Sequence, residues 1–338
     1  MIGSVGGGRL GLNRGPMIRA IVGIAISIVT VVVIVRGVDL AQVADILRTA
    51  QPAWIAVMLV ALCGDLAFRA LRWQRLLAPI HPVPYFHTLQ YLLIGYLANN
   101  ILPARLGELV RCHYLGDREG VSRTTVLGTV VVERVIDTVV VVAIASLSIL
   151  VLHVRGVVAS AVLFGLAITS LLVVVLAVLI VAHRLPGADR LARFAERWPT
   201  VADLARKLHG GLAVASRPRT LAEAIVLSFI AWSCTVIGFA AAGQALGLQL
   251  STAEASLLAS GVALATAIPS GPGNLGTFDL AAVAIATSFG VDQETAVALA
   301  ILTHSAVLIV SSLGGGIALL HLGWAHRTPA PISEAELS

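Results

Sequence analysis

Apolar residues in this chain gather into long runs that are separated by short polar segments. A helix that crosses a hydrocarbon core of about 30 Å needs about 20 predominantly apolar residues. Runs that reach or approach this length cover Ala20–Val35, Ala53–Phe68, Thr124–Val154, Val157–Ala182, Ala224–Leu248 and Thr295–Leu320. The pattern predicts an all-α polytopic membrane protein with about six full transmembrane helices. A further segment, Asp39–Ala50, alternates apolar and charged positions at helical spacing, which is typical of a short helix lying on the membrane surface.

Two further apolar runs are shorter and end in helix-breaking residues. Thr88–Leu102 would make a helix of only about 22 Å, and Ala253–Ile268 is of similar length. Broken backbone at membrane depth is tolerated only inside protein or facing a water-filled cavity. We therefore predict two re-entrant helical hairpins. Their turns are expected to contain Asn99, Asn100, Pro103 and Gly107 in the first break and Pro269, Gly271, Gly273, Asn274, Gly276, Thr277 and Asp279 in the second, with Thr277 as the cap of the helix that follows.

Arginines between the runs predict the orientation, because cytoplasmic loops carry an excess of Lys and Arg. They cluster before the first run, after the second and after the first break, at Arg9, Arg14, Arg19, Arg69, Arg72, Arg75, Arg105, Arg111, Arg118 and Arg123. This places both termini in the cytoplasm. A helix, a hairpin and a helix then occur twice in opposite orientations, which is the inverted repeat of alternating-access transporters.

Composition agrees with a membrane protein. The chain is 58% hydrophobic and 12% charged, whereas a typical soluble domain is about 25% charged. The net charge of +5 reflects the arginine-rich loops, so we expect no nucleic-acid partner. We divide the chain into a disordered tail (1–16), a transmembrane domain (17–322) and a polar C-terminal tail (323–338). The basic segment 184–219 within the domain predicts amphipathic helices on the inner leaflet.

Charged residues inside the long run 124–154 are the first candidates for function. Glu133 and Asp137 are four residues apart and share a helix face, and Arg134 precedes Asp137 by three and can reach it. A charge at the centre of a membrane helix costs at least about 2.5 kcal/mol, so such residues usually face a cavity. Two interpretations stay open: a site for a ligand or a proton, and an ion-paired clamp that holds the first hairpin.

Charged residues after the first break form the second candidate group. Arg105 and Arg111 flank Glu108, and arginines present donors that match phosphate oxygens. The helix after Pro103 also points its N-terminal amides into the membrane, which favours an anion. The alternative is a charged cytoplasmic rim. Elsewhere, Asp65 and Arg69 have the spacing of a structural i, i+4 pair, and His304 is interpreted mainly as a packed histidine.

The cysteines and histidines show no metal-binding spacing, so we expect neither metal nor cofactor. Catalytic motifs such as Gly-x-Ser-x-Gly and His-Glu-x-x-His are also missing from the sequence. We therefore expect a protein that is not an enzyme.

Four motifs in order resemble a known family. They are Arg-Ala-Leu-Arg-Trp at 69–73, Asn-Asn-Ile-Leu-Pro-Ala-Arg-Leu-Gly-Glu at 99–108, Glu-Arg-x-x-Asp at 133–137 and Pro-Ser-Gly-Pro-Gly-Asn-Leu-Gly at 269–276. Together they resemble the flippase-like membrane domain of lysylphosphatidylglycerol synthases, which also occurs alone in UPF0104 membrane proteins. The resemblance covers roughly residues 20–322. It implies movement of a lipid with an anionic head group between leaflets, without the aminoacyl transfer of the synthases.

Residues and resemblance together predict a lipid transporter or flippase of the cell membrane. Its partners would be membrane lipids, anionic or phosphate-linked, and a homo-oligomer is possible. The predicted head-group residues are Arg105, Glu108, Arg111, Glu133, Arg134 and Asp137. The alternatives are a proton-coupled transporter of a small anion and a membrane scaffold for a separately encoded transferase.

Overall fold

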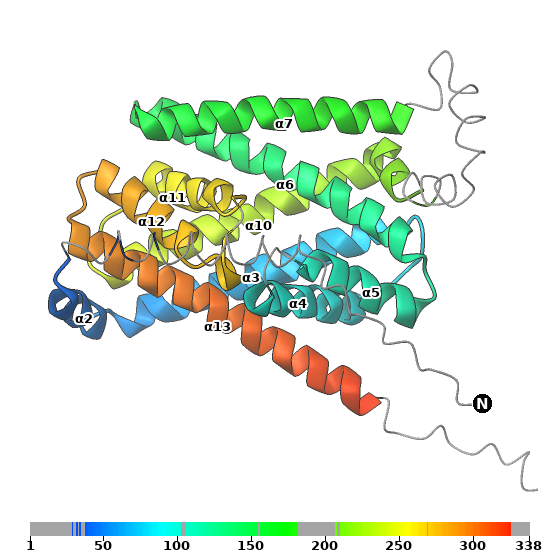
Figure 1. Ribbon diagram of the computed structural model, residues 1–338, viewed down its shortest axis with the longest axis horizontal. Helices are drawn as coiled ribbons and strands as arrows, with labels where there is room; N and C mark the ends of the chain where they lie inside the picture. Colours follow the sequence, from blue (N-terminus) through cyan, green and yellow to red (C-terminus); the bar gives the residue numbers. More distant parts are fainter. Residues whose placement is uncertain are drawn as a thin grey trace, which may run out of the picture.

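A computed structural model describes residues 38–102, 106–154, 156–181, 210–268 and 270–325, together with Val29, Val32, Ile34 and Lys207. Every regular element in these ranges is helical (Figure 1). The elements are α2 (Leu40–Arg48), α3 (Pro52–Leu77), α4 (Tyr85–Ile101), α5 (Gly107–Glu119), α6 (Arg123–Leu152), α7 (Val157–Val181), η3 (Ala213–Ser216), α10 (Pro218–Ala245), α11 (Thr252–Ala265), η4 (Pro272–Asn274), α12 (Thr277–Ser288) and α13 (Gln293–Ala325).

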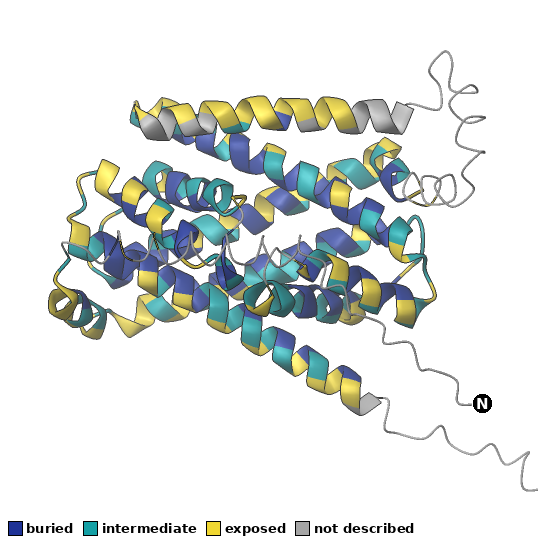
Figure 2. Ribbon diagram, in the orientation of Figure 1, coloured by how far each residue is buried: buried dark blue, intermediate teal, exposed yellow. Residues whose placement is uncertain are grey.

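The chain is a helical membrane protein. Four described helices, α3, α6, α10 and α13, are long and apolar enough to cross a membrane. Helix α7 packs beside α6, and most of its described residues are exposed (Figure 2). Its exposed side chains are large and apolar, among them Leu163, Phe164 and Leu171. A contiguous exposed apolar surface of this kind suits hydrocarbon rather than water. The predicted first helix and most of the basic segment 184–219 lie outside the described residues.

Helices α3 and α10 pack along each other in opposite directions. The Gln51 amide bonds the Ala245 carbonyl at one end, Thr235 bonds Asp65 near the middle, and Arg72 bonds Ser228 further along. Along these three contacts the residue numbers increase on α3 and decrease on α10. The two helices are therefore antiparallel.

The remaining packing exchanges elements between the two halves of the chain. Helix α4 of the first half packs against α13 of the second, and α11 of the second half packs against α6 of the first. Each half also folds its own short pair, α4 with α5 and α11 with α12. With α3 and α10 antiparallel, this is the arrangement expected of two repeats in opposite orientations.

The first predicted hairpin is present. Helix α5 folds back against α4, and the hydroxyl of Tyr91 near the start of α4 donates to Glu119 at the end of α5, 2.8 Å away. At the turn, the Gly107 amide donates to Asn99 Oδ1 at 2.7 Å. A Cβ on Gly107 would collide with the Gly95 carbonyl, so this close approach requires glycine. The predicted turn residue Pro103 lies outside the described residues.

The second break is an irregular turn between α11 and α12. Gly273, Asn274 and Gly276 all have positive φ angles, of 66°, 59° and 88°, a region that glycine and asparagine tolerate best. Asp279 Oδ2 accepts the Gly276 amide at 3.0 Å. The expectation that Thr277 caps α12 was wrong: Gly276 is the N-cap residue, and Thr277 begins the helix.

Thr277 instead closes the turn behind it. Its hydroxyl bonds Ser270 at 3.0 Å. The turn's first predicted residue, Pro269, is outside the described part of the chain, while Gly271 begins the short helix η4 as its N-cap residue.

The two breaks lie against each other. Helix α4 contacts η4, and the backbone around Gly273 lies next to the Asn100 carbonyl. Asn100 itself donates to the hydroxyls of Ser311 and Ser312 on α13, at 2.8 and 2.9 Å. Both predicted turns therefore meet at α13.

Candidate functional site

Helix α3 supplies the centre of a buried charge cluster. Arg72 is fully buried, and its guanidinium bonds Asp137 and lies 3.0 Å from Glu133 Oε1. Arg69, one turn earlier, bonds Asp65 at 2.8 Å and reaches Asp137 at 3.3 Å. The Asp65–Arg69 pair was predicted. The central position of Arg69 and Arg72 was not, because both had been interpreted as cytoplasmic anchors.

Helix α6 supplies the carboxylates that face these arginines. Glu133 and Asp137 are both buried and share one helix face, as their spacing predicted. Asp137 also accepts a hydrogen bond from the indole of Trp232 on α10, at 3.1 Å. Burial of ionised groups is stable only when they are paired and hydrogen-bonded. Three helices thus converge on Asp137.

Arg111 enters the same cluster from α5. Its Nη1 lies 3.1 Å from Glu133 Oε2, and its guanidinium stacks over the Trp73 ring at 4.5 Å. The side chain is buried, yet neither Nη1 nor Nη2 has a hydrogen-bond partner among the described residues. The contact with Glu133 is therefore an ion pair by distance without hydrogen-bond geometry.

Arg134 does not reach Asp137, which corrects the prediction from their spacing. Its Nη2 lies 3.4 Å from Glu108 and 3.8 Å from Glu133. Its side chain is 41% exposed, whereas that of Glu133 is fully buried. Adjacent residues on a helix point about 100° apart, so Glu133 faces the arginines of α3 while Arg134 faces the hairpin of α4 and α5.

The cluster balances its charges. Four arginines (Arg69, Arg72, Arg111 and Arg134) face four acids (Asp65, Glu108, Glu133 and Asp137). The two interpretations of the sequence each describe one part of it. The side from α3 is a dry ion-paired clamp between helices. The side from α5, with Arg111, Arg134 and Glu108, opens onto a pocket.

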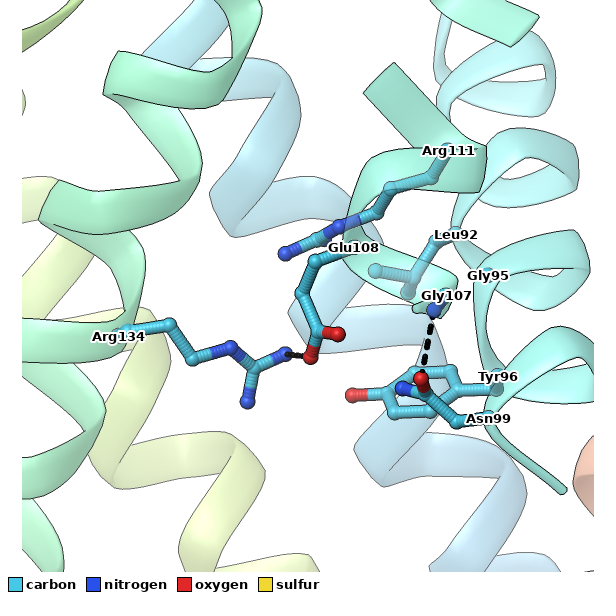
Figure 3. A pocket seen from close by; sticks show the side chains of 8 residues that line it. All are labelled: Leu92, Gly95, Tyr96, Asn99, Gly107, Glu108, Arg111 and Arg134. Atoms are coloured by element: carbon cyan, nitrogen blue, oxygen red, sulfur yellow. Dashed lines mark hydrogen bonds and ion pairs between the residues drawn. The ribbon is translucent and has the colours of Figure 1, made fainter. Parts of the chain in front are cut away.

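This pocket lies between the first hairpin and α6 (Figure 3). It encloses about 10 Å³ and is lined by Leu92, Gly95, Tyr96, Asn99, Gly107, Glu108, Arg111 and Arg134. Arg134 points toward the Glu108 carboxylate from α6, the Arg111 guanidinium passes beside the Glu108 side chain, and the Tyr96 hydroxyl points toward the same space (Figure 3). Sites for drug-sized ligands usually enclose about 300–1,000 Å³. The pocket therefore suits a single small polar group.

A second hollow is apolar. It lies between α3 and α10, has a volume of about 490 Å³ and is lined by Ala56, Val57, Val60, Ala61, Gly64, Cys234 and Ile237. It offers no donor or acceptor that could fix a head group. Its chemistry matches hydrocarbon chains.

Of the six predicted head-group residues, five are described, and the structure brings them into one cluster. Glu108, Arg111 and Arg134 line the pocket, while Glu133 lies behind it and Asp137 belongs to the clamp. Arg105 lies outside the described residues. In the part of the chain that the structure describes, no group of three or more His, Cys, Asp or Glu residues could hold a metal ion.

Sequence reasoning missed Arg69, Arg72, Trp73, Trp232 and Tyr96. A signal for the first two exists, because Asp65, Arg69 and Arg72 are spaced i, i+4, i+7 and so share one helix face. Three charges on one face of an otherwise apolar helix indicate an interior polar site. The tryptophans carry no comparable signal, because aromatic residues occur on both the buried and the lipid-facing sides of apolar helices.

Comparison with known proteins agrees with this architecture. One curated relative is a UPF0104 membrane protein of the archaeon Methanothermobacter thermautotrophicus, which is 29% identical over 118 residues. That match spans 34% of this chain and 35% of the relative. The family described as "Lysylphosphatidylglycerol synthase TM region" matches residues 20–315, which include every element of the cluster and both breaks. The chain therefore belongs to the family of the lysylphosphatidylglycerol synthase transmembrane region.

Proposed function

We propose that this protein moves a lipid with a phosphate-bearing head group between the leaflets of the cell membrane. The observation that carries the proposal is the pocket beside the first hairpin. There the buried Arg111 presents Nη2 without a hydrogen-bond partner, while its Nη1 is held by the ion pair with Glu133, and Arg134 presents Nε without a partner. A buried donor left unpaired costs about 1–3 kcal/mol, and more when it is charged. A ligand that accepts hydrogen bonds would remove this cost.

Phosphate is the group that fits best. Arginine binds phosphate oxygens through two parallel charge-assisted hydrogen bonds. The pocket encloses about 10 Å³, so it would have to widen to admit one phosphate group. The cluster has no excess of positive charge, since Glu108 and Glu133 offset the two arginines. Directed donors, not net charge, would therefore select the ligand.

The fold supports transport by alternating access. Two antiparallel repeats whose broken helices meet near one site are the usual design of secondary transporters. In this proposal about six helices span the membrane, α4–α5 and α11–α12 are re-entrant, and both termini are cytoplasmic. Acyl chains would remain in the bilayer or in the apolar hollow between α3 and α10. No catalysis is involved.

A second candidate is transport of a small water-soluble anion. The same arginines favour it, because inorganic phosphate offers them the same oxygens as a lipid head group does. The two candidates share their recognition chemistry and differ in whether the ligand carries tails.

Mass spectrometry of lipids that copurify with the protein tests the proposal. We expect one phosphate-bearing lipid to be enriched with the wild type and reduced at least tenfold with Arg134→Ala. Arg123→Ala is the matched control, because Arg123 is an exposed arginine that pairs with Asp117 at 2.6 Å away from the pocket, so this variant should retain the lipid.

Flipping of fluorescent phospholipids in reconstituted vesicles gives the second measurement, and Arg134→Ala should slow it. Equal lipid content and equal flipping in wild type and Arg134→Ala would overturn the proposal. Uptake of inorganic phosphate without lipid enrichment would favour the small-anion candidate.

A further inference from the structure

His304 occupies the middle of α13 and is 4% exposed. Both of its ring nitrogens have close partners. Nδ1 lies 2.8 Å from Asp279 Oδ1 on α12, and Nε2 lies 2.8 Å from the backbone carbonyl of Gly273 in the second break. A histidine buried with both nitrogens engaged is fixed in orientation, so its protonation state follows from its partners.

Both partners are acceptors. A carbonyl oxygen cannot donate, and an ionised carboxylate cannot donate either. A neutral imidazole carries one N–H and one lone pair, so it can satisfy only one of the two contacts. With Asp279 ionised, both contacts are hydrogen bonds only when the ring carries two protons. The Phe278 ring stacks on His304 with centroids 4.2 Å apart, and the face of an aromatic ring favours a cation.

The ring contacts both ends of the second turn. Asp279, which it contacts, accepts the Gly276 amide through its other oxygen at 3.0 Å. Gly273 lies at the start of the same turn and has φ 66°. The ring therefore bridges the turn from Gly273 to Gly276 and ties it to α13.

The same contact reaches the first break. The backbone at Gly273 lies next to the Asn100 carbonyl, and Asn100 is bonded to Ser311 and Ser312 two turns beyond His304 on α13. A change in the His304 contact would act at the point where the two broken hairpins meet.

Few other charges face His304. Asp279 is the only charged side chain within ion-pair distance of the ring among the described residues. On the packed helices, α4 carries no Asp, Glu, Lys or Arg, and Glu254 lies in the first turn of α11. On α3 and α10, Asp65 and Arg69 are paired with each other and Thr235 bonds Asp65.

The remaining charges lie further along the packed elements. Glu294 is ten residues away on α13 itself, about 15 Å along the helix. Helix α2 carries Asp45 and Arg48, which are exposed and paired with each other at 3.1 Å.

We propose that His304 is a proton-binding site that closes the second break, and that release of the proton opens it. When the proton leaves to water, the ring keeps one N–H. The contact with the Asp279 anion is the stronger one, so the contact with the Gly273 carbonyl breaks, because a ring lone pair then faces a carbonyl lone pair. The buried carboxylates Glu133 and Asp137 are less suited to this role, since arginines hold both of them.

The site does not depend on which ligand the protein moves, and its test needs no ligand. We would measure backbone hydrogen exchange of residues 270–280 in the purified full-length protein in lipid nanodiscs between pH 5 and pH 8.5, corrected for the intrinsic rate. Protection in the wild type should fall at least tenfold as the pH rises. Protection in His304→Gln should be low and independent of pH, because the glutamine amide does not take up a proton on acidification.

His321→Gln is the matched control, because His321 lies on the same helix, is exposed and bonds Gln90 at 2.9 Å. It should behave as the wild type does. Nitrogen NMR of the wild type with labelled histidine rings gives an independent measurement that needs no folded variant. One ring should show two N–H groups at low pH and lose one as the pH rises. The proposal would be overturned if protection of residues 270–280 in the wild type did not depend on pH. It would also be overturned if His304→Gln showed the same pH dependence as the wild type.

Discussion

At the scale of single residues, the arginines of the cluster differ in their surroundings. Arg72 is fully buried and bonds Glu133, Asp137 and Ser228. Arg134 is partly exposed and has one nitrogen without a partner. The first arginine neutralises buried carboxylates, so the fold depends on it. The second faces the pocket, where the proposed ligand would bind.

Arg72→Met should therefore destabilise the protein far more than Arg134→Ala. Removing one partner of a buried ion pair leaves an uncompensated charge and costs about 3–5 kcal/mol. A half-exposed pair contributes at most about 1 kcal/mol. Unfolding in denaturant, followed by circular dichroism in detergent micelles, measures both changes. Equal losses for the two variants would contradict the division between clamp and pocket.

The buried acids of the charge cluster were predicted more accurately from the sequence than its buried arginines were. Glu133 and Asp137 stand out because nothing else explains a carboxylate inside a long apolar run. Arg72 had a competing explanation, since arginines near helix ends usually mark the cytoplasmic side. Only the packing of α3 against α6 and α10 shows that it points inward. The predicted partner of Arg134 was wrong for a related reason. Sequence spacing shows which residues of one helix can contact each other, but it does not show whether a residue of another helix lies nearer.

At the scale of helices, glycines set how closely the breaks approach their neighbours. Gly314, Gly315 and Gly316 follow one another in α13, yet they differ in their surroundings. A Cβ on Gly315 would collide with the Leu93 carbonyl and Leu97 Cβ of α4, whereas a Cβ on Gly316 would meet nothing within 4 Å. Contact with the first hairpin therefore depends on one of these glycines in particular.

Gly315→Ala should lower the free energy of unfolding by about 1–3 kcal/mol, the usual cost of overpacking. Gly316→Ala is the control and should be neutral or stabilising by up to about 1 kcal/mol, because alanine favours the helix more than glycine does. Thermal unfolding in micelles compares the two variants. A stable Gly315→Ala protein would show that α4 and α13 are not packed this closely.

Helix positions were largely predictable, and helix ends less so. The predicted and observed bounds of α6 and α7 differ by at most two residues, because the apolar runs and their polar ends coincide with the helices. Helix α10 begins six residues before the predicted Ala224, at Pro218. Its first turn is polar, so a prediction from hydropathy alone places the start of the helix too late. Pro218 is well suited to begin a helix, and it is the signal that hydropathy does not use.

At the scale of the whole molecule, the two repeats explain why the breaks meet. Antiparallel α3 and α10 form the contact between the repeats, and each half contributes one short pair to the other half. The sequence predicted an inverted repeat from arginine distribution and run length alone. The antiparallel packing of α3 and α10 agrees with it, and the orientation of the repeats in the membrane stays a prediction. What the sequence could not predict is that the cluster is built mainly by one half, with α10 adding Trp232 and Ser228.

Labelling of single cysteines with a membrane-impermeant thiol reagent tests the proposed topology. In a background without Cys63, Cys112 and Cys234, Arg75→Cys and Asp117→Cys should react only from the cytoplasmic side. Gln249→Cys and Gln293→Cys should react only from the outside. All four positions are exposed.

The tip of the first hairpin separates a re-entrant pair from two full crossings. Leu106 is 41% exposed at this tip, and Leu106→Cys should not react from the outside. Modification of Leu106→Cys from the outside alone would mean that α4 and α5 cross the whole membrane.

The buried clamp also has a consequence for how the chain is synthesised. Arg72 lies 65 residues ahead of Asp137, and at about 5–20 residues per second the ribosome takes about 3–13 seconds to cover that distance. Helix α3 therefore reaches the membrane with arginines that each cost about 2.5–3.5 kcal/mol to insert alone. We expect its stable release into lipid to be delayed until α6 emerges, so that α3 and α6 would insert as a pair of helices joined by their charges.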